Sequence, residues 1–272
     1  MDAPYRTILV HVDLSVHAPA RMRYAAALAR AHGAHLIGAA FSGVARSMFA
    51  QDEEADAGRL PDDARRALVH FETIANEQQV RHEPRFVQDQ ADAGLAGLAR
   101  FANLVVLSQD DPLEAMPEMA VHLPEYMVMN CARPVLVVPR TNPAPCRHPK
   151  ALVAWNGSKV ASFALSASIP LLRQAADVTV AALTGKDGGD LAFREQLQEM
   201  AHFLGRYHVN PHILVRTPRQ DTAHELLALA AELGSGMLVL GCFGHTRFRE
   251  LCRGGTSRTV LAESPIPFVM AH

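Results

Sequence analysis

The chain has 272 residues, of which 49% are hydrophobic and 20% are charged, as is typical of globular proteins and unlike disordered chains. Because single domains commonly span roughly 100–200 residues, this length predicts two domains. The formal net charge is −2, which argues against bulk electrostatic attraction to nucleic acid or to anionic membranes. We therefore expect neither nucleic acid nor membrane among the partners.

Short apolar runs rich in β-branched residues alternate with helical patterns along the first part of the chain. The helical pattern of residues 17–32 is followed by Gly33, which is a plausible C-cap. In chain order the patterns predict strands at 7–12, 34–41, 84–87, 104–107 and 134–138, and helices at 17–32, 62–79, 91–101 and 121–130.

The second part of the chain repeats this alternation. It predicts strands at 151–154, 178–183, 212–215, 237–240 and 267–270, and helices at 158–175, 191–207, 221–234 and 255–263. Strands that alternate with helices indicate parallel βαβ units with right-handed crossovers. Strands 104–107 and 237–240 are apolar throughout, as expected when helices cover both faces of a sheet.

Three landmarks occur in the same order in each half, which indicates an internal repeat. An apolar run that ends in Asp or Asn, then one residue, then Ser occurs at 8–15 and again at 151–158. The apolar strands at 104–108 and 238–241 correspond, as do the terminal strands at 132–138 and 265–270. Three prolines in 139–145 favour a linker. The repeat predicts domains at 1–141 and 147–272.

The sequence also bears on cellular location, on the redox state of the cysteines and on metal binding. There is no basic segment followed by an apolar run at the start, and no run reaches the ~18 apolar residues of a membrane helix. None of the four cysteines forms a CxxC pair, so we expect a reduced, cytoplasmic protein. The scattered histidines are better interpreted as surface or packing residues than as metal ligands, and no metal site is predicted.

A glycine-rich loop follows the fourth strand of the second half. Its glycines are spaced Gly241-x2-Gly244-x9-Gly254, and the next helix begins near Gly255, Thr256 and Ser257. Backbone N–H groups and the dipole at a helix N-terminus favour an anion. Arg247, Arg249, Arg253 and Arg258 bring positive charge to the same segment. The loop predicts a phosphate site; the plainer alternative is a surface turn before a capped helix.

With this loop and the repeat, the chain resembles the universal stress proteins in a tandem two-domain form. The resemblance covers both halves, but Gly255 stands where the family's ATP-binding members carry Ser or Thr. It implies an α/β fold of two Rossmann-like, adenine nucleotide alpha hydrolase-like domains. Each has a doubly wound parallel five-stranded sheet flanked by helices. It also implies a pseudo-dimer in which strands 134–138 and 267–270 pair antiparallel. A further homodimer stays open.

The same resemblance implies a nucleotide site in the second half. Asn156 replaces the acidic residue that contacts the nucleoside, and the backbone near Leu183 meets the adenine. The nucleotide-binding residues implied by position are Ala154, Trp155, Asn156, Leu183, Gly241, Gly244, His245, Arg247, Gly254, Gly255, Thr256 and Ser257.

The first half keeps Asp13 but lacks the loop. Ser108 and Asp111 stand where the second half has Gly241 and Gly244. Asp110 and Asp111 repel phosphate, and residues 121–124, counted without gaps, end in a proline that has no N–H. We expect this nucleotide site to be degenerate.

Three functions remain open. The first is a stress-response protein that binds ATP or a related adenine nucleotide, with or without Mg²⁺, as a regulatory ligand. The second is a slow Mg²⁺-dependent ATPase, although no catalytic residue can be assigned and Asn156 lacks the charge of a metal anchor. The third is a nucleotide-free interaction scaffold.

Overall fold

The computed structural model describes residues 4–43, 61–112, 122–141, 150–185, 190–242 and 255–272. The first half contains β1 (Thr7–His11), α1 (Ala18–His32), β2 (His35–Phe41), α2 (Asp62–Glu77), β3 (His82–Val87), α3 (Ala91–Ala99), β4 (Leu104–Ser108), α4 (Leu123–Asn130) and β5 (Val135–Val138). The second half contains β6 (Lys150–Ala154), α5 (Lys159–Leu172), β7 (Asp177–Leu183), α6 (Leu191–Gly205), β8 (His212–Arg216), α7 (Thr222–Leu233), β9 (Met237–Gly241), α9 (Thr256–Glu263) and β10 (Phe268–Ala271). Each predicted strand and helix is present, with ends close to those predicted.

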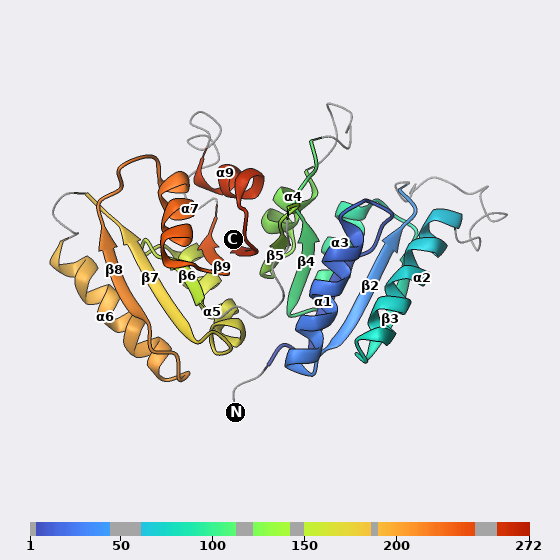
Figure 1. Ribbon diagram of the computed structural model, residues 1–272, viewed down its shortest axis with the longest axis horizontal. Helices are drawn as coiled ribbons and strands as arrows, with labels where there is room; N and C mark the ends of the chain where they lie inside the picture. Colours follow the sequence, from blue (N-terminus) through green and yellow to red (C-terminus); the bar gives the residue numbers. More distant parts are fainter. Residues whose placement is uncertain (1–3, 44–60, 113–121, 142–149, 186–189, 243–254) are drawn as a thin grey trace.

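The strands of the described residues form one ten-stranded sheet in the order β3-β2-β1-β4-β5-β10-β9-β6-β7-β8. Neighbouring strands within each half are parallel. The two halves lie side by side and meet where β5 pairs antiparallel with β10, with Leu136 opposite Val269 (Figure 1). The predicted fold class and the predicted pairing of the terminal strands are both confirmed.

Helices cover both faces of this sheet, and each face has one hydrophobic core that crosses the junction between the halves. One core contains buried residues of α1, α2, α5 and α6, and the other contains buried residues of α3, α4, α7 and α9. Successive strand residues alternate between the cores, as Leu9 and its neighbours Ile8 and Val10 do. Because both faces of such a strand are buried, its successive residues are apolar and do not alternate with polar residues.

Helix ends follow signals that are visible in the sequence. Gly33 adopts a left-handed conformation with φ of 62° after α1, as expected of a C-cap glycine. The side chains of Ser158, Asp190 and Asp221 accept hydrogen bonds from the first-turn backbone N–H groups of α5, α6 and α7. These caps fix the N-termini of α5 and α7 at the edge of the sheet where the site lies.

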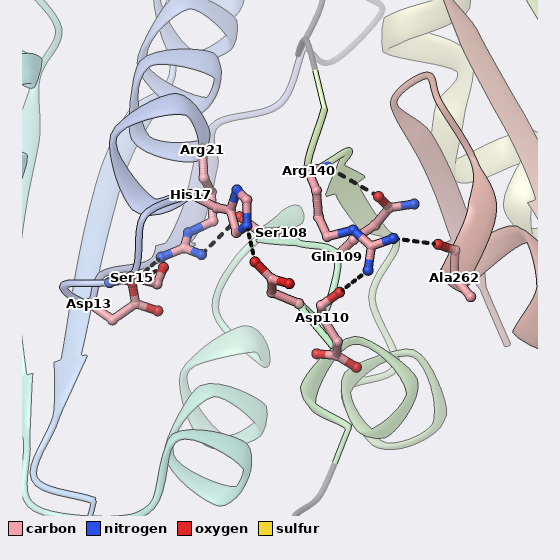
Figure 2. A network of polar contacts seen from close by, with 10 residues as sticks. Asp13, Ser15, His17, Arg21, Ser108, Gln109, Asp110, Arg140 and Ala262 are labelled. Carbon is pink, nitrogen blue, oxygen red and sulfur yellow. Dashed lines mark hydrogen bonds and ion pairs between the residues drawn. The ribbon is translucent and has the colours of Figure 1, made fainter. Parts of the chain in front are cut away.

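Polar contacts supplement the strand pairing between the halves. Gln109 donates from Nε2 to the Ser264 carbonyl at 2.9 Å, and its Oε1 accepts from the Arg140 backbone N–H at 3.1 Å. The Arg140 guanidinium donates to the carbonyls of Asp110 and Ala262, so it joins the end of β4 to the last turn of α9 (Figure 2). These bonds set the position of α9 relative to the first half.

Within the residues that the structure describes, no helix combines the length and apolarity needed to cross a bilayer. The thiols of Cys131 and Cys242 are buried. Burial raises the pKa of the Cys131 thiol, so its reactive thiolate form is disfavoured.

Candidate functional site

The strand order of each half creates a crevice at the carboxyl ends of two neighbouring strands. These are β1 and β4 in the first half and β6 and β9 in the second. The helices that follow β6 and β9, α5 and α9, pack in opposite cores. In parallel α/β sheets, such a switch point is where ligands bind.

A cavity of about 240 Å³ occupies the switch point of the second half. The predicted residues Ala154, Trp155, Asn156, Leu183, Gly241, Thr256 and Ser257 line it together. Its wall also includes residues that sequence reasoning did not name, namely Ser158, Val160, Ala161, Ala181, Thr222, Leu226 and Leu240. Thr222 had a detectable signal, since it begins a helix that starts at the same edge of the sheet.

The remaining predicted residues are placed as follows. Gly255 is the N-cap of α9 and directly precedes two cavity residues. Gly244, His245, Arg247 and Gly254 lie outside the described residues, as do Arg249 and Arg253. The Arg258 guanidinium donates to the Glu125 carboxylate on α4 at 2.9 and 3.2 Å, so its charge is engaged by the first half instead of by a phosphate.

The loop between β6 and α5 forms one wall of the cavity. Asn156 Oδ1 accepts from the Ser158 N–H at 3.1 Å, which holds a tight turn, and the Nδ2 donors of Asn156 take no part in that turn. The Trp155 N–H donates to the Ala181 carbonyl at 2.9 Å. The indole Nε1 of Trp155 is buried and has no hydrogen-bond partner among the described residues.

The N-terminus of α9 forms the opposite wall. Within α9 the first amides that find a helical acceptor are those of Arg258 and Thr259, both bonded to the Gly255 carbonyl. Thr256 and Ser257 precede them in the first turn of α9, where the backbone N–H groups of a helix point toward its N-terminal end. Their hydroxyls and the helix dipole make this end of the cavity favourable for an anion.

Gly241 is required by packing between β9 and α5. A Cβ at this position would lie 2.6 Å from the Val160 carbonyl oxygen and would also overlap the Ala161 backbone N. Only glycine lets the end of β9 approach the first turn of α5 this closely. The first glycine of the loop motif therefore shapes the cavity wall and also brings two elements together.

The corresponding place in the first half is filled by an arginine side chain. Arg21 is buried, and its Nε donates to the His11 carbonyl at 2.9 Å. Nη1 donates to Ser108 Oγ at 2.9 Å, and Nη2 lies 2.9 Å from Asp13 Oδ1 (Figure 2). Nearby, His17 Nε2 lies 2.8 Å from Asp111 Oδ2.

This cluster sets the protonation of its members. Burial raises the pKa of Asp13, but the Arg21 charge, His11 and hydrogen bonds from Ser15 outweigh burial and hold that pKa well below its usual range. Burial and the Arg21 charge lower the pKa of His11 to about 4. At neutral pH, Asp13 is therefore ionised and His11 is uncharged.

Three comparisons with known proteins bear on the fold. No protein-family model matches the chain, and no curated protein matches it. A universal stress protein from Archaeoglobus fulgidus DSM 4304 matches with a TM-score of 0.76 at 15% identity, covering 97% of this chain and 95% of its own. A protein of unknown function from Pseudomonas aeruginosa PAO1 matches with a TM-score of 0.63 at 15% identity, covering 98% and 92%. A universal stress protein in complex with cAMP covers 46% of this chain and 98% of its own, with a TM-score of 0.39 and 16% identity.

The sheet and its switch points define the chain as a tandem, doubly wound α/β protein with the ligand-site geometry of that class. Among such proteins it has the tandem fold of the universal stress proteins, matched over nearly its full length. The resemblance noted in the sequence is confirmed at the level of the fold.

Proposed function

We propose that this chain is a tandem universal stress protein that binds ATP or a related adenine nucleotide, as a regulatory ligand, in the cavity of its C-terminal half. The observation that carries the proposal is the cavity itself. It lies at the switch point and joins an apolar wall near Leu183 and Ala181 to the N-terminus of α9. These are the two environments that an adenine ring and a phosphate need.

The residues that line the cavity determine the proposed orientation of the nucleotide. The adenine lies beside the end of β7, where Leu183 and Ala181 line the cavity. The ribose faces Asn156, whose amide supplies hydrogen bonds without charge. The phosphates approach the N–H groups and hydroxyls of Thr256 and Ser257 and continue toward the glycine loop. We propose the cytoplasm as the setting, which the buried thiols suit.

A slow Mg²⁺-dependent ATPase is the second candidate. The described cavity wall contains no carboxylate, since Asn156 stands where an acidic residue would hold the metal. This composition favours binding over hydrolysis. If Mg²⁺ accompanies the nucleotide, the phosphates themselves supply its ligands together with water.

One titration separates these functions. Trp155 lines the cavity and is the single tryptophan of the chain, so its fluorescence reports on this site alone. The purified protein is titrated with ATP, ADP and AMP, with and without Mg²⁺, while released phosphate is measured. We expect saturable fluorescence changes without turnover. Phosphate release at a steady rate indicates the ATPase. If neither fluorescence nor phosphate release changes at millimolar nucleotide, the nucleotide-free interaction scaffold is the function that remains.

Thr256→Asp is expected to weaken nucleotide binding by at least about tenfold without lowering stability. A carboxylate in the first turn of α9 interacts favourably with the helix dipole, by about 0.3–1 kcal/mol, but repels a phosphate at the same end. Affinity is measured by the Trp155 titration and stability by thermal unfolding. Thr256→Asn is the matched control, since it has the same shape without the charge. Equal affinities for the two variants contradict the proposed position of the phosphates.

Gly244→Asp examines the part of the loop that lies outside the described residues. A side chain and a negative charge at the second glycine of the motif are expected to abolish nucleotide binding. Unchanged affinity in the Trp155 titration means that the motif does not contact the phosphates.

A further inference from the structure

The Arg21 guanidinium is held as a bound cation would be held. Nε donates to the His11 carbonyl and Nη1 to Ser108 Oγ, each at 2.9 Å, and Nη2 forms an ion pair with Asp13 Oδ1 at 2.9 Å without a hydrogen bond of good geometry. The Arg21 side chain is only 3% exposed. A planar guanidinium that donates two hydrogen bonds and faces a carboxylate is geometrically more specific than a single point charge would be.

These partners come from the place where a ligand is expected. His11 and Ser108 end β1 and β4, and Asp13 follows β1, so the guanidinium sits at the switch point of the first half (Figure 2). It is supplied by α1, the helix that follows β1.

The second half lacks the three side chains of this arrangement. When Ile8 is aligned with Ala151 and Leu104 with Met237, Arg21 corresponds to Ala164, Asp13 to Asn156 and Ser108 to Gly241. Ala164 is buried like Arg21. In the second half Asn156 and Gly241 line the cavity, whereas in the first half the corresponding Asp13 and Ser108 contact the Arg21 side chain.

We propose that the N-terminal half retains a ligand site of its own, with a preference for a guanidinium-type cation, and that the side chain of Arg21 is its built-in occupant. The carboxylates of Asp13 and Asp111 give this site the opposite charge preference to the phosphate end of the other half. The two copies therefore differ in the charge that they favour, and the Arg21 side chain lies at the switch point of the first half. The inference does not depend on nucleotide binding in the second half.

Chemical complementation tests this proposal. Arg21→Ala leaves out the atoms of ethylguanidinium, so ethylguanidinium chloride at low millimolar concentration is the probe. We expect the variant to have a lower Tm than the wild type and to regain about half or more of the loss, saturably, when the probe is added. Ethylammonium chloride at equal concentration is expected to give a much smaller rise, because it lacks the planar fork. The wild type and Arg81→Ala, which alters an arginine that donates to the Gly33 carbonyl, are expected to show no rise.

A second variant covers the case in which Arg21→Ala fails to fold. Asp13→Asn combined with Arg21→Ala copies the residues of the second half and removes the unpaired carboxylate. We expect this double variant to fold, with a Tm above that of Arg21→Ala, and to have lost the response to ethylguanidinium. The proposal is overturned if Arg21→Ala does not respond to the probe. If Arg21→Ala folds, an equally large rise in the Tm of the double variant on addition of ethylguanidinium also overturns the proposal. If Arg21→Ala is unfolded, any rise in the Tm of the double variant on addition of ethylguanidinium overturns it.

Discussion

Gly241→Ala is expected to lower the free energy of unfolding by about 1–3 kcal/mol, the usual cost of forcing extra atoms into a packed interior. The added Cβ meets backbone atoms of Val160 and Ala161, which cannot turn aside as a flexible side chain can. Either β9 or the first turn of α5 must shift. Because both elements form walls of the cavity, nucleotide affinity measured by Trp155 fluorescence is expected to fall together with stability in urea.

Gly97→Ala is the matched control for this prediction. Gly97 lies within α3, and a Cβ there meets nothing within 4 Å. This variant is expected to gain about 0.5–1 kcal/mol, because alanine restricts the unfolded chain and favours helix. Both substitutions restrict the unfolded chain alike, so the comparison sets a site where the added Cβ clashes with backbone against one where it meets nothing within 4 Å. If Gly241→Ala is as stable as the wild type, the first turn of α5 moves at little cost.

Acidification from pH 6.5 to 4 is expected to destabilise the protein through His11 and His32. Burial lowers the pKa of each to about 4, with the Arg21 charge contributing at His11. In the unfolded chain these histidines take up protons near pH 6.5, whereas in the native state they remain neutral to about pH 4. Their stabilising contribution is therefore complete above pH 6.5 and is lost as the pH falls to 4. The loss is at most about 3 kcal/mol for each histidine.

The measurement is the free energy of unfolding in urea at intervals between pH 7.5 and 4. His32→Gln is expected to remove about half of the slope, because glutamine does not titrate. His202→Gln is the control, since His202 is exposed on α6. His224 acts in the opposite sense, because its hydrogen bond with Asp221 raises its pKa, but that pair is on the surface and its effect is small. A pH-independent wild type would contradict a buried, neutral state of His11 and His32.

Much of the fold was predictable because its signals are local and repeated. Apolar runs such as 104–107 lie between two helical layers, so they lack alternation and are easily distinguished from surface strands. The repeat then indicated which strands correspond, and the family resemblance implied the pairing of β5 with β10, which is confirmed. The family resemblance supplied the doubly wound arrangement of each five-stranded sheet, which periodicity alone does not contain.

The candidate site was predictable only in part. Gly241 ends β9 and Asn156 lies two residues after β6, so their position at the carboxyl edge could be inferred from the sequence. Leu226 belongs to a helix far along the chain, and its place in the cavity wall depends on tertiary packing. Arg21 was missed for a different reason. An arginine within an Ala-rich helical pattern looks like a surface residue, because most arginines are exposed. Only the fold shows that this one reaches Asp13 and Ser108.

The antiparallel pairing of β5 with β10 has a consequence for how the two sites evolve. In a symmetric dimer of identical chains, every substitution appears twice, so both sites must keep the same chemistry. Joining the copies in one chain removes that constraint, and it makes their association independent of protein concentration. One copy is then able to hold an arginine where the other holds an alanine, without any loss of the shared sheet.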